Sequence, residues 1–199
     1  MEIQLWREIL EPYELAVREL SLKFDHLMTE YREHGRYCPF LRVDGRVKSV
    51  SSILEKAQKK KIPFEMIEEE MEDIAGIRII CQFVEDIDKV AQIIEKRGDM
   101  QIKCVKDYLT NAKPSGYRSY HLILEIPIFL SDRKLPVRVE VQLRTVAMDF
   151  WASLEHQMKY KKELPDAEAI GAQLRECAET IASIDQRMMD IRDQITQCE

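Results

Sequence analysis

The stretch from Lys113 to Arg144 constrains the fold most, because it contains two segments in which apolar and polar residues alternate. In the second segment, Val137 to Leu143, every other residue is a branched aliphatic. An alternation with a period of two is typical of a strand that turns one face to the core. The opposite face of this predicted strand carries a carboxylate flanked by two arginines and an amide, a set that suits an anionic ligand: Arg138, Glu140, Gln142 and Arg144.

The first alternating segment, Ser119 to Pro127, follows a basic loop with a glycine hinge, Lys113 to Arg118. His121 lies on one face of this segment, and the opposite face holds Tyr120, Leu122, Leu124 and Ile126. A turn-like piece, residues 131–134, leads from this segment into the second one. The sequence therefore predicts two strands that present polar groups beside a loop rich in cations and backbone donors.

The whole chain has the size and composition of one globular domain. Its 199 residues are 45% apolar and 33% charged, which argues against global disorder. Apolar runs stay below the roughly 18 residues that a membrane helix needs, and the N-terminus lacks the features of a signal peptide. Five scattered cysteines without a CxxC pair indicate reduced thiols, and neither a disulfide framework nor a zinc site. We therefore expect a cytoplasmic protein that does not bind membranes.

The net charge of −6 hides a strong local asymmetry. Residues 46–61 contain six basic residues and a single acid, and an acidic run, residues 65–73, follows directly. An acidic protein with one concentrated basic segment is a poor general coat for nucleic acid. The pattern favours the binding of a small polyphosphate.

The basic segment is predicted to be the start of a helix that runs from Gly45 to about Lys61. Serines near its first turn can cap it, and a helix N-terminus together with basic side chains favours a phosphate group. Ser52, Lys56 and Lys59 would then lie along one face. A solvated basic helix is the alternative explanation of this segment.

Asp73 stands at a predicted junction between a short acidic helix, residues 65–72, and a strand, residues 77–83. A carboxylate at such a junction can hold a hard cation such as Mg²⁺, which prefers a few carboxylates plus substrate phosphate oxygens. Arg78 interrupts the otherwise apolar strand, which is costly unless the arginine has a partner. Both residues are therefore candidates for a binding site.

The remaining periodicities complete an α+β prediction, a single mixed sheet flanked by long N- and C-terminal helices. Helices are expected at residues 3–32, 85–96, 145–159 and 166–196, a further strand at residues 100–109, and a loop at residues 33–44. Trp151 is interpreted as a core residue, because it belongs to the apolar stripe of its helix. We expect one globular unit, with an N-terminal helix (1–34), a core (43–160) and a C-terminal helix (165–199).

Several of these segments together resemble the RelA/SpoT synthetase domain. The matching motifs occur in the family's order: Gly45–Lys48 (GRVK), Asp73–Arg78 (DIAGIR), Ser115–His121 (SGYRSYH), Glu140–Thr145 (EVQLRT) and the helix Ala147–His156. The short chain is similar to stand-alone small alarmone synthetases, whose synthetase domain has a nucleotidyltransferase-like fold. It lacks the histidine and His-Asp pattern of the hydrolase domain in the longer relatives, so no hydrolase activity is expected.

The resemblance implies a GTP pyrophosphokinase of the stringent response. Such an enzyme transfers pyrophosphate from ATP to the ribose 3′-hydroxyl of GTP or GDP and produces (p)ppGpp and AMP. By the family pattern, Glu140 is the general base and a contact of Mg²⁺, and Asp73 is the principal metal ligand. Because negative charge must be neutralised during an in-line attack, positioning and cations should carry most of the catalysis.

The resemblance also implies two nucleotide sites. In the ATP site, Arg46 and Arg78 would lie on either side of the adenine. The ATP phosphates would be held by Lys48, Ser52, Lys56 and Lys59. The GTP or GDP site would stack guanine on Tyr117 and use polar groups around it: Lys106, Lys113, Ser115, Gly116, Arg118, His121, Gln142 and Asp149. Asp149 stands where several relatives have asparagine, and it can still accept hydrogen bonds from guanine.

Two other functions are compatible with the same residues. One is a catalytically inactive nucleotide sensor, and the other is a single-stranded RNA-binding module that uses the lysine-rich helix and the aromatic residues. The negative net charge argues against RNA binding as the main role. The family pattern further implies a homo-oligomer, with a tetramer favoured, and a single-stranded RNA as a candidate regulator.

Overall fold

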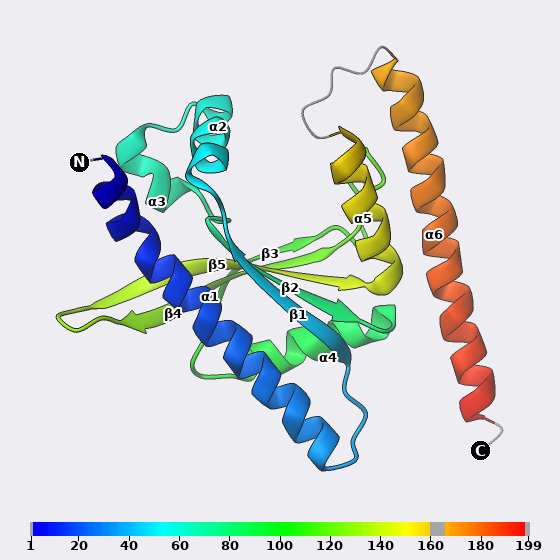
Figure 1. Ribbon diagram of the computed structural model, residues 1–199. Helices are drawn as coiled ribbons and strands as arrows, with labels where there is room; N and C mark the ends of the chain where they lie inside the picture. The colour runs from blue at the N-terminus through cyan, green and yellow to red at the C-terminus, as the bar shows by residue number, and fades with distance from the viewer. Residues whose placement is uncertain (1, 160–165, 198–199) are drawn as a thin grey trace.

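The fold was analysed in a computed structural model that describes residues 2–159 and 166–197. Helices and strands follow one another in a single chain order: α1 (Glu2–Glu33), β1 (Phe40–Val47), α2 (Val50–Lys60), the 3₁₀ turn η1 (Phe64–Met66), α3 (Ile67–Glu70), β2 (Ala75–Cys81), α4 (Val84–Glu95), β3 (Gln101–Asp107), β4 (Tyr120–Phe129), β5 (Lys134–Thr145), α5 (Val146–Lys159) and α6 (Ala167–Thr196). Figure 1 shows α1 crossing in front of the sheet and α6 alongside α5.

The strands form one five-stranded sheet in the order β1-β2-β5-β4-β3. The β2–β5 pair is parallel and the other neighbouring pairs are antiparallel. This arrangement confirms the predicted α+β class with a mixed sheet. The predicted helices and strands after residue 64 are confirmed with their ends within three residues, although the short acidic helix is divided into η1 and α3.

Strand β1 is the element that was predicted wrongly. Residues 40–44 were expected in a loop and Gly45 at the start of a helix, but both belong to an edge strand that pairs with β2. Gly45 is needed there because a Cβ would lie 2.6 Å from Val17 Cγ1 and 2.8 Å from Ser21 Oγ of α1. Close packing of a helix on the strand therefore explains the glycine at this position. Helix α2 begins at Val50, with Ser49 as its N-cap residue.

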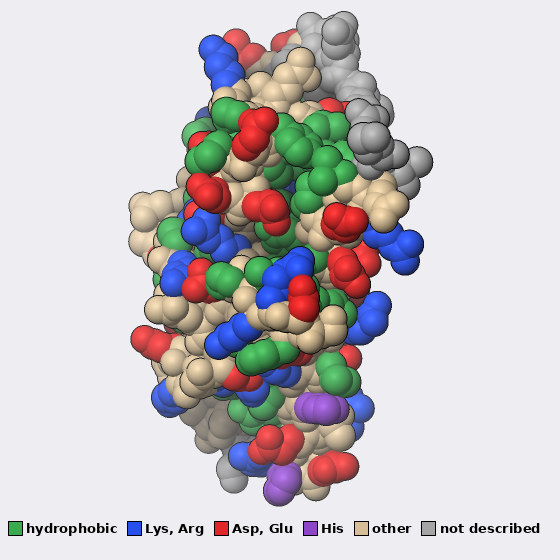
Figure 2. Space-filling model, turned by 90° about the vertical axis from the view of Figure 1, so that its left-hand side faces the viewer, with side chains coloured by type: hydrophobic (Ala, Val, Ile, Leu, Met, Phe, Trp, Pro, Cys, Tyr) green, Lys and Arg blue, Asp and Glu red, His purple; other side chains and the backbone are tan. Residues whose placement is uncertain are grey.

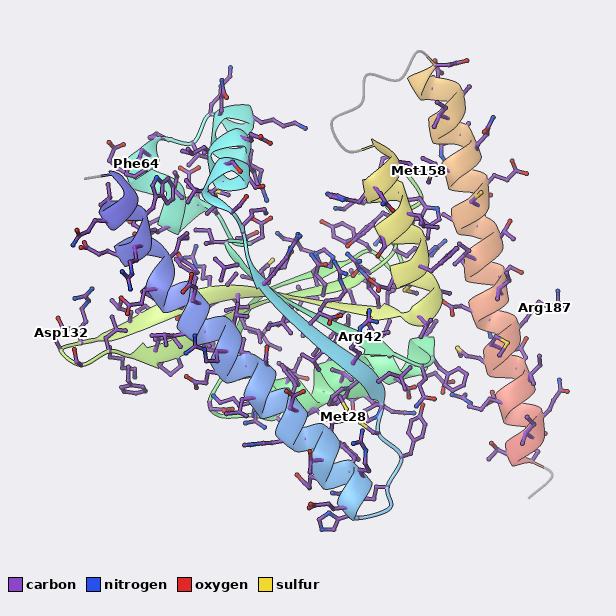
Figure 3. The ribbon with its side chains drawn as sticks, viewed as in Figure 1. Met28, Arg42, Phe64, Asp132, Met158 and Arg187 are labelled. Carbon is purple, nitrogen blue, oxygen red and sulfur yellow. The ribbon has the colours of Figure 1, made fainter. Side chains whose placement is uncertain are left out.

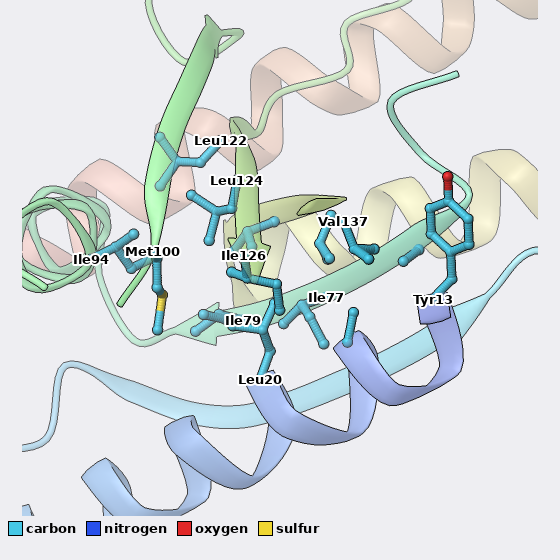
Figure 4. Packing of buried hydrophobic residues seen from close by; sticks show 14 of the residues in the cluster. Tyr13, Leu20, Ile77, Ile79, Ile94, Met100, Leu122, Leu124, Ile126 and Val137 are labelled. Carbon is cyan, nitrogen blue, oxygen red and sulfur yellow. The ribbon is translucent and has the colours of Figure 1, made fainter. Parts of the chain in front are cut away.

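The main hydrophobic core lies between one face of the sheet and helices α1 and α4. Leu20 and Phe24 of α1 are fully buried, and Figure 4 shows Leu20 beside Ile77 and Ile79 of β2. The predicted apolar face of β5, from Val137 to Leu143, is buried in the same core. Because successive strand residues point to opposite faces, the polar residues of these strands are directed away from α1.

A second, smaller cluster forms between α5 and α6. It contains Trp151, Ala152, Leu174 and Ala178 and is called here the α5–α6 cluster. Trp151 is buried, as predicted, and its Nε1 donates a hydrogen bond to the Leu174 carbonyl at 2.9 Å. The N-terminal part of α6 is therefore fixed to α5 by both apolar packing and a buried hydrogen bond.

Acidic and basic side chains are interspersed on the side of the molecule where α1 begins (Figure 2). Hydrophobic side chains gather in the upper part of the same view. Leu5 and Phe64 are exposed hydrophobic residues, and Phe64 lies close to the start of α1 in Figure 3. Among the described residues, no helix is long and apolar enough to cross a bilayer.

Candidate active site

One row of polar side chains crosses the face of the sheet opposite α1. The strand registers pair these residues in sequence across all five strands: Asp44, Arg78, Gln142, His121 and Lys106. Glu140 lies on the same face of β5, two residues before Gln142, and pairs with Gly76 of β2. The sequence predicted the polar faces of β4 and β5 correctly. The sheet order adds what the sequence could not, which is the side-by-side placement of residues from β1, β2 and β3.

Glu140 lies at the centre of this face, with 14% of its side chain exposed. His121 Nδ1 is 3.1 Å from Glu140 Oε1, and Gln142 Nε2 donates to Oε2 at 2.7 Å. Burial raises the pKa of the Glu140 carboxyl, but the hydrogen bonds from His121 and Gln142 outweigh it and leave the pKa below its ordinary value. Glu140 is therefore an oriented carboxylate at neutral pH.

Arg144 closes a ring of hydrogen bonds around Glu140. It is 5% exposed, and its Nη2 donates to Tyr117 Oη and to Gln142 Oε1, each at 2.7 Å. Tyr117 Oη is in turn 2.9 Å from His121 Nε2. Since the phenol oxygen accepts from Arg144, its hydrogen is available for Nε2, and in that tautomer His121 donates Nδ1–H to Glu140. Two chains of hydrogen bonds thus connect Arg144 to both carboxylate oxygens.

The sequence placed Arg144 on the polar face of its strand, among residues that suit an anionic ligand, but gave it no role in either nucleotide site. A third partner compensates for the burial of its charge, because Nη1 lies 3.1 Å from Asp149 Oδ1 in the first turn of α5. Asp149 also pairs with Arg78 at 3.3 Å and with Arg42 at 3.2 Å. Arg42 was likewise missed, since it belongs to the strand that was predicted as a loop. Figure 3 shows Arg42 at the middle of the molecule.

Asp73 precedes β2 and is bound by two lysines. Lys48 Nζ and Lys56 Nζ each lie 2.5 Å from Asp73 Oδ2. Burial raises the pKa of the Asp73 carboxyl, but these two hydrogen bonds outweigh it and lower the pKa below its usual range. The other oxygen, Oδ1, is buried and has no hydrogen-bond partner among the described residues. Asp73 is therefore a charged carboxylate with one oxygen available for a further ligand.

A pocket of about 220 Å³ joins Asp73 to Glu140. Its lining comes from β1, β2 and β5 and the segments beside them: Asp44, Gly45, Arg46, Lys48, Asp73, Ile74, Gly76, Ile77, Arg78, Glu140 and Gln142. The described residues contain no group of three or more histidine, cysteine or acidic side chains that could hold a metal ion. A cation here would depend on the two carboxylates together with oxygens of a bound substrate and water, which is the pattern that Mg²⁺ favours.

The loop before β4 and the end of β3 form an aromatic and cationic group next to Glu140. Tyr117 meets Tyr108 and His121 edge to face, with ring centroids 6.2 and 5.9 Å apart. Lys113 Nζ lies 4.4 Å from the Tyr108 centroid and 4.8 Å from the Tyr117 centroid. Lys106 forms an ion pair with Glu72, a residue that the sequence reading did not single out. This region offers an aromatic face and positive charge for a second ligand.

Some predicted site residues do not line the pocket. Ser52 Oγ accepts from Ser49 Oγ at 3.0 Å in the first turn of α2, and Lys59 lies exposed in its last turn. Ser115 Oγ accepts from the Tyr117 amide at 3.4 Å. Arg118 is directed elsewhere, because it donates to the Leu109 carbonyl at 2.8 Å and borders α6. These residues are adjacent to the site in the chain, and these hydrogen bonds join them to residues no more than nine positions away.

Comparison with known proteins identifies the class of this domain. Residues 45–164 match the model of the region found in RelA / SpoT proteins, so the chain belongs to the RelA/SpoT family and the predicted resemblance is confirmed. It is 40% identical over 199 residues to the GTP pyrophosphokinase YjbM of Bacillus subtilis (strain 168), with 100% of this chain and 94% of that protein covered.

Solved structures give the same assignment. The small alarmone synthetase 1 from Bacillus subtilis bound to its product pppGpp matches with a TM-score of 0.91 at 41% identity, covering 97% of this chain and 99% of that one. The same synthetase bound to AMPCPP matches with a TM-score of 0.82 at 38% identity, covering 98% and 99%. The chain therefore has the fold of small alarmone synthetases along almost its whole length.

Proposed function

We propose that the chain is a GTP pyrophosphokinase that transfers pyrophosphate from ATP to the 3′-hydroxyl of GTP or GDP. The products are (p)ppGpp and AMP. The observation that carries this assignment is the pocket that joins an oriented carboxylate, Glu140, to a lysine-bound carboxylate, Asp73. Relatives that are named for this activity, or are bound to its product, and that match almost the full chain support the choice of substrates.

Glu140 is the proposed general base. The 3′-oxygen forms a new bond to the β-phosphorus of ATP while the bond from that phosphorus to the oxygen bridging the α-phosphate breaks, and AMP leaves with the bridging oxygen. The hydroxyl proton moves to Glu140, whose low pKa keeps it ionised at neutral pH. His121 and Gln142 orient the carboxylate through the hydrogen bonds described above. The ring closed by Arg144 would hold this geometry without reorganisation during the reaction.

Mg²⁺ is the proposed cofactor, and the residues present fit it. Asp73 Oδ1 is buried without a hydrogen-bond partner among the described residues, as expected of an oxygen reserved for a cation. Asp73 and Glu140 would hold the ion together with phosphate oxygens. When bound, it would neutralise negative charge on the phosphates. Lys48 and Lys56 would contribute further positive charge on the same side.

ATP is assigned to the pocket, and the acceptor nucleotide is assigned to the aromatic and cationic group beside Glu140. We propose that ATP binds between β1 and β2, with Arg46 and Arg78 on the adenine and Lys48 and Lys56 on the phosphates. We also propose that Ser52, near the start of α2, and Lys59, in its basic last turn, contact the ATP phosphates. The acceptor binds at this aromatic group, with Tyr117 under guanine. Its other proposed contacts are Lys106, Lys113, Ser115, Gly116, Arg118, His121, Gln142 and Asp149.

The direct test incubates wild-type protein and a Glu140→Val variant with labelled ATP, GTP and Mg²⁺ and separates the products by charge. We expect a new guanosine polyphosphate and AMP from the wild type alone. A folded, nucleotide-binding wild type that yields no product would favour the inactive sensor. Product from both proteins would keep the enzyme and reject Glu140 as the base.

Three further parts of the proposal concern the setting of the enzyme. Since ATP and GTP are cytosolic metabolites, we place the reaction in the cytoplasm. A homotetramer follows the family pattern, and light scattering on the purified chain tests it. A single-stranded RNA regulator would use the exposed lysines at the end of α2, Lys59 to Lys61. Retention of single-stranded RNA at 0.15 M salt would support this, and loss of binding below that salt concentration would reject it.

A further inference from the structure

Helix α6 contributes no lining residue to the pocket between Asp73 and Glu140, as far as the structure describes the chain. It nevertheless contacts both segments that shape the acceptor half of the proposed site, which is the part around Tyr117 that is proposed to bind GTP or GDP. One segment is the loop Lys113–Arg118, and the other is the corner where β5 passes into α5. The long C-terminal helix therefore has contacts that simple coverage of a hydrophobic core does not require.

The first contact is at Gly116, where the backbone has a positive φ of 90°. A Cβ at this position would lie 2.6 Å from Ala178 Cβ and 3.3 Å from Arg175 Cα, so the loop touches the backbone of α6. This approach requires glycine in the loop and a small residue at position 178. The next residue, Tyr117, packs against the α5–α6 cluster. The position of the Tyr117 ring thus depends on α6.

The second contact is a buried hydrogen bond between α6 and the β5–α5 corner. Asp185 is 8% exposed, and Thr145 Oγ1 donates to its Oδ2 at 2.5 Å. The same hydroxyl accepts from the Met148 amide at 3.1 Å, in the first turn of α5. Because a buried carboxylate without a partner is costly, Asp185 at this position depends on its hydrogen bond with Thr145. Arg144 directly precedes Thr145, and Asp149 lies one turn further along α5.

Ala178 and Asp185 lie two turns apart on one face of α6. We propose that this face of α6 is the positioning element of the acceptor site, with Asp185 acting through Thr145 and Ala178 acting through Gly116. The inference rests on the proposed function and deepens it, because it assigns α6 to one of the two nucleotides. No described residue of α6 lines the pocket assigned to ATP. Substitutions on this face should therefore weaken the binding of the guanosine nucleotide and leave the binding of ATP nearly unchanged.

The test compares Asp185→Ala with Asp185→Asn and with a control, Asp190→Ala. The control removes a carboxylate from the same helix that is exposed and accepts a hydrogen bond from Gln186 of that helix. We expect Asp185→Ala to raise the KM for GTP about tenfold and to leave the KM for ATP within about twofold. Asp185→Asn keeps an acceptor for Thr145, so it should stay close to wild type, as should Asp190→Ala.

Titration calorimetry with GTP and with AMPCPP, done on the same proteins, measures binding apart from turnover. A tenfold loss of GTP affinity with unchanged AMPCPP affinity would support the role of α6, even if no product were formed. A wild type without turnover would reject the proposed function alone. Equal losses for both nucleotides, or unchanged GTP affinity in a folded Asp185→Ala protein, would overturn the inference.

A second variant covers the case in which Asp185→Ala does not fold. Ala178→Val places two methyl groups against Gly116 and should displace the loop that carries Tyr117. We expect the same selective rise in the KM for GTP, with kcat at saturating GTP reduced much less. An Ala178→Val protein with unchanged GTP kinetics would contradict a positioning role for this face.

Discussion

The two halves of the proposed site are built differently. The donor half, around Asp73, is a set of close ion pairs on segments supported by the main core. The acceptor half, around Tyr117, is a ring of hydrogen bonds supported by the α5–α6 cluster. Fixed charges suit a polyphosphate and a cation, whereas directional hydrogen bonds suit a planar base and a hydroxyl group. Glu140 lies where the two meet, so its carboxylate belongs to both.

The largest effect is expected in the donor half. Asp73→Asn removes the charge that Lys48 and Lys56 share. Its one remaining oxygen would face the two lysines, so an amide nitrogen would replace the oxygen proposed for the cation. Loss of several kcal/mol of transition-state stabilisation should lower kcat about 10³-fold. Rates at increasing Mg²⁺ concentration measure this effect, with Glu72→Gln, which loses only its pairing charge toward Lys106, as the control. An Asp73→Asn enzyme with nearly normal activity at millimolar Mg²⁺ would contradict the assignment.

The acceptor half should respond through its buried arginine. Arg144→Met removes the donor that joins Tyr117, Gln142 and Asp149. We expect the free energy of unfolding to fall by about 1–3 kcal/mol, because buried acceptors lose their partner. The KM for GTP should rise more than the KM for ATP. Urea unfolding and initial rates measure the two effects.

The matched control for that variant is Arg138→Met, in the same strand. Arg138 is half-buried and donates to the Glu69 carbonyl at 2.6 Å, away from the ring. It should change the free energy of unfolding by about 1 kcal/mol or less. Similar losses in both variants would mean that the ring around Arg144 has no special role.

The pH dependence of the reaction depends on the carboxylate of Glu140, which lies where the donor half and the acceptor half meet. Its pKa is depressed in the folded protein, so the active carboxylate is lost only as the pH falls through that lowered pKa. His121→Ala removes one cause of the depression, and the acidic limb of the kcat profile should move to higher pH. His26→Ala, on the exposed face of α1, should leave the profile unchanged. An acidic limb that does not move in His121→Ala would reject the coupling.

The last prediction concerns the packing of the main core that supports the donor half. Gly45→Ala forces a Cβ against Val17 and Ser21, so we expect it to cost about 1–3 kcal/mol of unfolding free energy. Gly98→Ala has open space around the new Cβ and should change stability by about 0.5 kcal/mol or less. Thermal melts of both variants check this. A neutral Gly45→Ala would mean that α1 does not pack as closely on β1 as described.

The sequence predicted those parts of the site that are local in the chain. The alternation in β4 and β5 placed Glu140, Gln142 and His121 on one face, because side chains of a strand alternate with a period of two. Strand β1 was missed because it is an edge strand with one fully buried residue, Phe40, and a glycine inside it. Its pairing with β2 and its contact with α1 override the local signal.

Contacts between distant segments could not be predicted from the sequence. Arg144 is adjacent in the sequence to residues that were assigned roles, but its partners come from the loop before β4 and from α5. Asp185 belongs to a helix that was predicted from its apolar stripe alone, and its hydrogen bond with Thr145 spans forty positions of the chain. The predicted division of the chain into core and flanking helices stays a prediction.

The most direct test of the account is the single-turnover rate of Glu140→Gln with both nucleotides bound. Gln keeps the shape of the side chain and an oxygen for His121, but it cannot take a proton. We predict that AMPCPP and GTP bind with dissociation constants within about threefold of wild type, while transfer falls by about 10³-fold or more. Transfer at close to the wild-type rate would show that the carboxylate at the junction of the two halves is not the base.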